Sequence, residues 1–295
     1  MTPTTHTQHS ARLRRTLRRE VPGTVGLLTD PRDFAAMTGY RSFPFRDEDW
    51  PSYLGHLDGL LKSLRGQGLH TTVTLFDPDD YAAWCTETGA DPDTPAARTR
   101  FTAHLAATGT ALPYTGEPLD TLLPRLVDAA VRQATWEYAT LLLAGLGPCA
   151  ECGADIGADA LDRAGLLLDG LLTGAGPGHH HLVCSVPAER EQLVAPHHTG
   201  GGARSRLEFL SVLAAGIALD RPGGVVLRTS GEGGPDRVHG WRLTDGALTP
   251  LTAAEVFDAY CTDADSGDLL PPEPGVTYCA GFPVADPGPR HGHHR

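Results

Sequence analysis

The stretch GPCAECGAD, residues 147–155, has the residue types and spacing with the clearest chemical meaning in this chain. Cys149 and Cys152 are three positions apart, so one tight turn can bring both thiolates to the same ion. Gly153 adds no side-chain bulk beside the second sulfur, and Pro148 stiffens the entry to the turn. Because structural zinc takes four ligands at about 2.0–2.3 Å, this CxxCG turn predicts half of a zinc site.

The nearest donors for the other half lie in the run HHHLVC, residues 179–184. On a flat strand, His180 and Cys184 would share a face but stand about 13 Å apart, at ~3.3 Å per residue. Ligands of one tetrahedral zinc ion lie only about 3.7 Å from each other. If the histidines instead belong to the preceding turn, His181 and Cys184 can form a second, HxxC knuckle. The predicted metal ligands are therefore Cys149, Cys152, Cys184 and His181, with His180 as the substitute histidine.

The segment EQLVAPHH, residues 191–198, is expected to run back beside 179–186 as a hairpin. With a tight turn at 187–190, His180 would lie opposite His197, within the ~5 Å separation of cross-strand pairs. Two histidines there, with Asp155 or a cysteine, would make an open catalytic metal site. The alternative is that these histidines are polar residues at the water-facing end of a sheet.

Three other interpretations of the cysteine pair remain open. A thioredoxin-like redox centre would follow a strand and open a helix, whereas a long helix is predicted before this motif. The two thiols could also be buried without a function. The letters PCAEC match the PCxxC half of the zinc-deaminase signature, but the other half is an upstream HxE. Because His56, His70 and His104 are not followed by that glutamate, the likeness covers half a motif.

The elements that must position these groups begin with an internal echo. Residues 24–37, TVGLLTDPRDFAAM, and 72–84, TVTLFDPDDYAAW, both contain an apolar run, Asp-Pro, and Asp-aromatic-Ala-Ala. We expect each to form a buried strand followed by a helix, with the Asp as N-cap and the Pro at the first helical position. Since ligands bind beyond the carboxyl ends of parallel strands, a pocket or cation site at Asp30, Asp77, Asp79 and Asp80 is a second alternative.

The apolar pattern predicts helices at 47–68, 94–108, 117–145, 158–173, 203–219 and 252–261, and strands at 223–230 and within 237–251. The fold class is α/β to α+β, with a parallel sheet in the first half and a mixed sheet with helices in the second. The predicted regions are a basic arm (1–22), an α/β region (23–146), an α+β region with the zinc site (147–270) and an irregular tail (271–295). The tail closes with RHGHHR, whose histidines bind metals weakly.

Composition narrows the class of protein. The chain has 295 residues, 40% hydrophobic and 20% charged, as in globular proteins. A net charge of −12 argues against broad nucleic-acid binding, with a local exception in RLRRTLRR, residues 12–19. No apolar run approaches the roughly 20 residues of a membrane span, and the N-terminus does not resemble a secretory signal. We therefore expect a cytoplasmic zinc protein with a binding or regulatory role toward a protein or small molecule, or alternatively a small-molecule enzyme.

Overall fold

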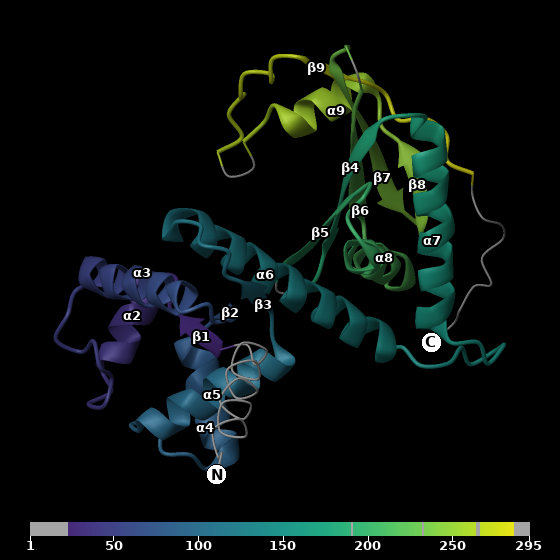
Figure 1. Ribbon diagram of the computed structural model, residues 1–295. Helices are drawn as coiled ribbons and strands as arrows, with labels where there is room; N and C mark the ends of the chain where they lie inside the picture. Colours follow the sequence, from purple (N-terminus) through teal and green to yellow (C-terminus); the bar gives the residue numbers. More distant parts are fainter. Residues whose placement is uncertain (1–22, 190, 232, 264–265, 286–295) are drawn as a thin grey trace, which may run out of the picture. The chain divides into compact units, whose positions relative to one another are not determined.

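The computed structural model describes residues 23–189, 191–231, 233–263 and 266–285, and Figure 1 shows its helices and strands. The chain divides into two compact units, residues 1–133 and 134–295, and the division falls within one helix, α6 (Leu119–Ala144). The described residues form helices with two separate sheets, which confirms the predicted α/β to α+β class. The four predicted regions stay predictions, and the basic stretch 12–19 lies outside the described residues.

Unit 1–133 contains a small sheet of order β1-β2-β3, in which β1 and β2 are parallel and β3 is antiparallel to β2. The parallel sheet and the helix at 47–68 between its two strands were predicted, whereas β3 was not. Its elements are β1 (Gly23–Leu27), α2 (Pro31–Thr38), α3 (Trp50–Gly66), β2 (Thr71–Leu75), α4 (Pro78–Thr88), α5 (Pro95–Thr108) and β3 (Ala111–Pro113).

The two Asp-Pro turns have the predicted capping role. Asp30 Oδ1 accepts hydrogen bonds from the backbone N–H groups of Arg32 and Asp33, at 2.5 and 3.2 Å. Asp77 Oδ1 accepts in the same way from Asp79 and Asp80. Each cap satisfies N–H groups that have no partner inside the helix, so each turn sets where its helix begins.

Unit 134–295 contains the larger sheet, of order β5-β4-β6-β7-β8, with β9 paired to β7. Neighbouring strands are antiparallel except for β7 and β9, which are parallel. Its elements are α7 (Ile156–Ala175), β4 (His179–Pro187), β5 (Gln192–His198), α8 (Ala203–Ala218), β6 (Gly223–Ser230), β7 (Asp236–Thr244), β8 (Ala247–Pro250), α9 (Ala253–Tyr260) and β9 (Val276–Tyr278).

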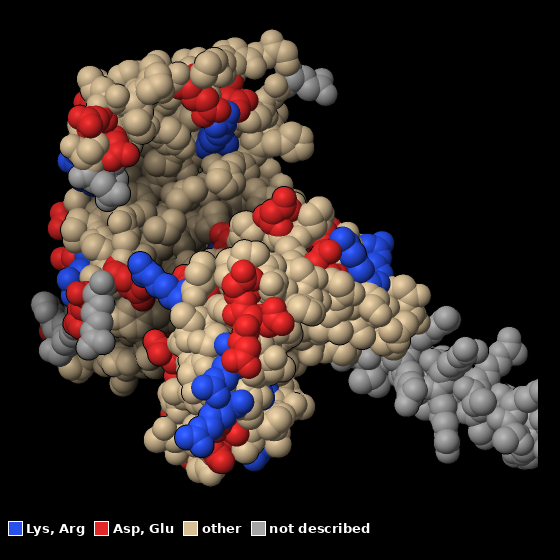
Figure 2. Space-filling model, turned by 90° about the vertical axis from the view of Figure 1, so that its left-hand side faces the viewer, with Lys and Arg blue, Asp and Glu red and all other residues tan. Residues whose placement is uncertain are grey.

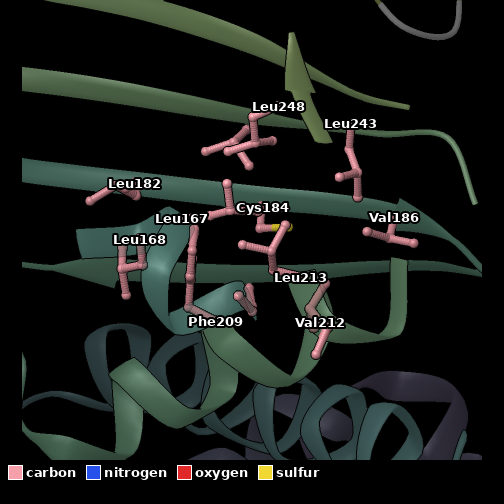
Figure 3. Packing of buried hydrophobic residues seen from close by; sticks show 14 of the residues in the cluster. Leu167, Leu168, Leu182, Cys184, Val186, Phe209, Val212, Leu213, Leu243 and Leu248 are labelled. Atoms are coloured by element: carbon pink, nitrogen blue, oxygen red, sulfur yellow. The ribbon is translucent and has the colours of Figure 1, made fainter. Parts of the chain in front are cut away.

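The helices of this unit divide between the two faces of the large sheet. Helix α8 packs on β4 and β5 and also contacts α7, while α9 packs on β7 and β9 (Figure 1). Along β4, His180, Leu182, Cys184 and Val186 are buried and alternate with more exposed residues. The buried set joins leucines of α7 and α8 in one apolar core (Figure 3). Strand alternation therefore decides which β4 residues enter this core.

Most predicted helices and strands are present. Pro124 lies within the first turns of α6 without ending it, since a proline near a helix start removes few hydrogen bonds. β9 lies in the tail, which was predicted to be irregular. Asp245 and Gly246 form the turn between β7 and β8, and both residues have positive φ, as a type I′ hairpin turn requires. Among the described residues, no helix is long and apolar enough to cross a membrane.

Candidate metal centre

The Cys149–Cys152 segment forms a hydrogen-bonded hairpin turn between α6 and α7. Pro148 and Asp155 form an isolated antiparallel bridge. Inside it, the Cys149 N–H donates to the Ala154 carbonyl (2.8 Å), and the Gly153 N–H donates to the Cys149 carbonyl (2.9 Å). Gly153 has φ +73°, which glycine adopts at little cost. The backbone therefore holds the two cysteines on one closed turn, as the sequence predicted.

Both ends of this turn are fixed to helices. Asp155 caps α7 by accepting from the Ala158 N–H at 2.8 Å, and the Ile156 N–H donates to the Gly147 carbonyl at 3.2 Å. A Cβ at Gly157 would lie 2.9 Å from the Leu143 carbonyl oxygen, so α7 starts directly against the end of α6. A turn anchored on two packed helices keeps its geometry better than a loop would.

The two thiols of the turn differ in exposure. Cys149 is buried, at 3% relative exposure, whereas Cys152 is exposed. An ion bound here would lie at the edge of the core, with access from solvent through Cys152.

Cys184 and His181 lie elsewhere in the same unit. β4 is regular from His179 onward, so His181 and Cys184, three positions apart, point to opposite faces of the sheet. Cys184 is fully buried in the core between the sheet and α8 (Figure 3), and burial raises the pKa of its thiol to about 12. The second knuckle required the histidines to lie in the preceding turn, and that condition is not met.

The four predicted ligands are thus not gathered. In the part of the chain that the structure describes, no three His, Cys, Asp or Glu side chains form a group that could hold a metal ion. Zinc at the Cys149–Cys152 turn stays a prediction, with its other ligands to be sought outside β4.

His180 and His197 also differ from the prediction. β4 ends at Pro187 and β5 begins at Gln192, and these two residues are paired, so His181 lies opposite His198 instead of His180 opposite His197. His180 and His197 lie on the helix-facing side and are buried. The His180 ring is within hydrogen-bond distance of Thr229 Oγ1 (3.1 Å) and the Gly176 carbonyl (3.0 Å). His197 Nδ1 lies 3.3 Å from Ser205 Oγ.

The cross-strand pair His181 and His198 lies on the opposite face of the sheet. Burial, followed by the nearby His198 and Arg228, lowers the pKa of His181, so its imidazole favours the neutral form. Arg228 is held by Asp236 (2.7 Å) and by both carboxylate oxygens of Glu273 (2.9 and 3.0 Å). On the surface shown in Figure 2, most basic side chains stand beside acidic ones.

The acidic residues at the Asp-Pro turns come close to one another. Burial, followed by the charges of Asp30, Asp77 and Asp79, raises the pKa of Asp33. Burial, followed by the charges of Asp77 and Asp79, also raises the pKa of Asp80. Capping accounts for Asp30 and Asp77, and a ligand pocket at this edge stays a prediction.

The packing of the segment that follows β9 against α7 was not predicted from the sequence. Phe282 packs edge-to-face on Trp241, with ring centroids 4.8 Å apart, and its carbonyl accepts from Trp241 Nε1 at 2.8 Å. A Cβ at Gly174 of α7 would collide with the Phe282 ring, and one at Gly170 would lie 2.9 Å from Val284 Cγ1. Two glycines four apart on one helix face are the signal that could have indicated this docking groove.

Comparison with known proteins adds one match. Residues 12–117 match a family model described as "Domain of unknown function (DUF8829)". The matched residues cover most of unit 1–133 and none of unit 134–295. No curated protein and no solved structure matches the chain.

Proposed function

We propose that this chain is a zinc-binding protein in which Cys149 and Cys152 supply two of the four ligands. The closed hairpin turn carries this proposal, because its Pro148–Asp155 bridge and its Gly153 hold both cysteines on one short segment. Zinc sites of the CxxC type require two sulfurs from one turn to reach the same ion.

The ion would have a structural role at the joint between α6 and α7. The ten residues from Gly145 to Ala154, together with the cap Asp155, connect the two helices. Thiolate ligands favour a closed site, whereas catalytic zinc keeps a position for water and more often uses histidine and carboxylate. Bound zinc would therefore add stability to this connection and to the packing of Leu143 against α7.

In this proposal the protein binds or regulates a partner, either another protein or a small molecule. Zinc–thiolate sites and reduced cysteines fit the cytoplasm, which is the compartment we infer. The overall charge of −12 makes a polyanionic partner a poor electrostatic match.

Metal analysis of the purified full chain tests this proposal. We expect about one zinc ion per chain in the unmodified protein, and loss of that zinc in Cys149→Ser and in Cys152→Ser. Cys279→Ser is the matched control, since Cys279 is a partly buried thiol whose Sγ lies 3.7 Å from the Thr277 carbonyl. Adding a chelator should lower the unfolding temperature of the unmodified protein but not that of Cys149→Ser. Unmodified protein that takes up no zinc during refolding would contradict the proposal.

A second candidate function is a small-molecule or catalytic site at His181 and His198. The observation that favours it is their direct cross-strand pairing on the face opposite α8. A neutral imidazole can bind a metal or accept a proton near pH 7. Zinc titrated into the Cys149→Ser/Cys152→Ser double variant should then shift the imidazole NMR signals of His181 and His198. Unchanged signals at saturating zinc would remove this candidate.

A further inference from the structure

One end of the large sheet carries a row of polar side chains on the face that packs on α8. The strand register pairs His180 of β4 with Thr229 of β6. It also pairs Arg237 of β7 with Thr229 on one side and with Thr277 of β9 on the other. Residues paired in this way point to the same face of a sheet, with Cβ atoms about 5 Å apart. The adjacent row, toward the middle of the sheet, begins with two fully buried leucines, so the polar row marks the end of the apolar core.

A cavity of about 410 Å³ lies at this row, next to the end of α7. A Cβ at Gly178 would lie 2.9 Å from the Ser230 carbonyl oxygen, so the segment after α7 is held against the end of β6. Cavities that bind small molecules range from about 300 to 1,000 Å³, so this one is large enough for a small ligand. Its lining includes Thr229, Arg237 and Thr277 from the row, Pro177 after α7, and Gly234 and Pro235 from the turn between β6 and β7.

The buried hydroxyl group of the row already has a partner for its hydrogen. His180 Nε2 lies 3.0 Å from the Gly176 carbonyl, which can only accept, so Nε2 carries the hydrogen of the neutral ring. The other ring nitrogen, Nδ1, is then an acceptor, and the Thr229 hydroxyl, 3.1 Å away, donates to it. Thr229 therefore fixes one wall of the cavity without offering its hydrogen to a ligand.

Arg237 supplies the positive charge of the cavity. Among the residues that the structure describes, no carboxylate lies within ion-pair distance of its guanidinium group. Asp236, the preceding residue, is bonded to Arg228 at 2.7 Å. Thr277 is exposed beside Arg237 and adds a hydroxyl group. A guanidinium group can bind two oxygens of one carboxylate or phosphate, and such charged hydrogen bonds are stronger than neutral ones.

We propose that this cavity binds a small molecule that carries a carboxylate or phosphate group on an apolar body. Arg237 binds the oxyanion, and the Thr277 hydroxyl donates a further hydrogen bond to it. An inorganic anion would occupy only part of the cavity, whereas an apolar body would also contact the rings of Pro177 and Pro235. Such a ligand would be a small-molecule partner of the kind proposed above, but its site contains none of the proposed zinc ligands.

NMR titration of the full chain with benzoate and with phenyl phosphate presents both oxyanions on the same apolar ring. We expect at least one of them to shift the Arg237 Nε–Hε signal and the amide signals of Thr229 and Thr277 in a saturable way, and the tighter binder identifies the oxyanion. Benzamide lacks the charge and inorganic phosphate lacks the ring, so each should bind about tenfold more weakly or worse. Absence of saturable shifts with both aromatic anions, or benzamide that binds as tightly as benzoate, would overturn the proposal.

Substitution of Arg237 tests the residue that binds the anion. Arg237→Gln should weaken binding of the preferred anion about tenfold or more, because it removes the charged hydrogen bonds. Arg237→Lys keeps the charge without the planar fork and should give an intermediate affinity. The matched control is Arg242→Gln on the opposite face of the same strand, where Arg242 pairs with Glu255 at 3.2 Å. Circular dichroism checks that the variants are folded, and folded Arg237→Gln with unchanged affinity would contradict the assignment.

Two further variants separate this site from a competing carboxylate and from the zinc site. Glu232 belongs to the same turn but lies outside the described residues, and Glu232→Gln should bind the anion at least as tightly as the unmodified chain. Binding by Glu232→Gln alone would mean that Glu232 already occupies Arg237, which would overturn the site. The Cys149→Ser/Cys152→Ser variant should bind the anion as the unmodified chain does. A chain without zinc that still binds the anion would therefore contradict the zinc proposal and support this one.

Discussion

The two compact units bury different kinds of side chain. The core of unit 1–133 is built around aromatic rings, including Phe34, Tyr53, Phe76, Tyr81 and Phe101, on a sheet of only three strands. The core of unit 134–295 consists mainly of Leu, Val and Ala between a six-stranded sheet and two helices. A small sheet offers little area to bury, so large rings supply it. A broad sheet buries many small aliphatic residues instead.

The two units also differ in the close contacts that their cores make with the backbone. In unit 1–133 two of the buried rings, Tyr53 and Tyr81, carry hydroxyl groups with backbone partners. Tyr53 Oη accepts from the Leu28 N–H at 3.1 Å, and Tyr81 Oη donates to the Pro92 carbonyl at 2.7 Å. Burial raises the pKa of Tyr53 to about 12. In unit 134–295 close backbone approach depends on glycine, at Gly170 and Gly174 of α7. The units should therefore respond to different substitutions.

The largest expected effects come from removing one large ring in each unit. Trp241→Ala should destabilise unit 134–295 by about 3–5 kcal/mol, and Phe101→Ala should do the same to unit 1–133, because each leaves a cavity in its own core. Both side chains are almost fully buried, at 0% and 2% exposure. Differential scanning calorimetry of the two variants should show that each lowers a different unfolding transition. A single transition lowered equally by both would mean that the units unfold together.

A smaller effect is expected where the tail docks on α7. Gly174→Ala places a methyl group in the position of the Phe282 ring and should cost about 1–3 kcal/mol. The matched control is Gly165→Ala on the same helix, where a Cβ has no atom within 4 Å. The control should stabilise by about 0.5–1 kcal/mol. Urea unfolding measures the free energy of unfolding of both variants. Equal values would show that the Phe282 ring moves aside at little energetic cost.

Removing a helix cap should lower the free energy of unfolding by less than Gly174→Ala does. Asp77→Ala removes the acceptor for two N–H groups of α4 and should destabilise unit 1–133 by about 1 kcal/mol. Thr252→Ala removes the capping box of α9 and should have a similar effect on unit 134–295. Asp77→Asn keeps a capping oxygen and should stay near the unmodified stability. An Asn variant as unstable as the Ala variant would show that the negative charge matters more than the hydrogen bonds.

The smallest expected effect is that the stabilities of the two units depend differently on pH. His181 and His197 have lowered pKa values, mainly through burial, so the unfolded chain binds more protons below about pH 6.5. Unit 134–295 should lose stability as the pH falls from 7.5 to 5.5. Asp33 and Asp80 have raised pKa values, so they should stabilise unit 1–133 as the pH falls further toward 3.8.

Thermal unfolding in the presence of a chelator measures this dependence without a contribution from bound metal. The double variant His181→Gln/His197→Gln should flatten the response of unit 134–295 between pH 7.5 and 5.5. If the variant loses as much thermal stability between pH 7.5 and 5.5 as the unmodified chain, titratable groups other than His181 and His197 cause the loss.

Local patterns were sufficient for much of the fold. The Asp-Pro turns, the helix at 203–218, the 223–230 strand and the Asp245–Gly246 turn all depend on residues close together in sequence. The hairpin form of the Cys149–Cys152 turn also follows from its own proline and glycine. The strand β3 has only three residues, Ala111–Pro113, too few to show a period in the sequence.

The sequence by itself determined the helix starts at the two Asp-Pro turns and the closed turn around Cys149 and Cys152. Both depend on backbone geometry that neighbouring residues specify. Only the tertiary structure decided that Cys184 enters the core, that His181 pairs with His198, and that Phe282 lies against α7. Register and docking depend on loop length and on contacts between distant segments, and a change of one residue in a strand turns its side chains to the other face.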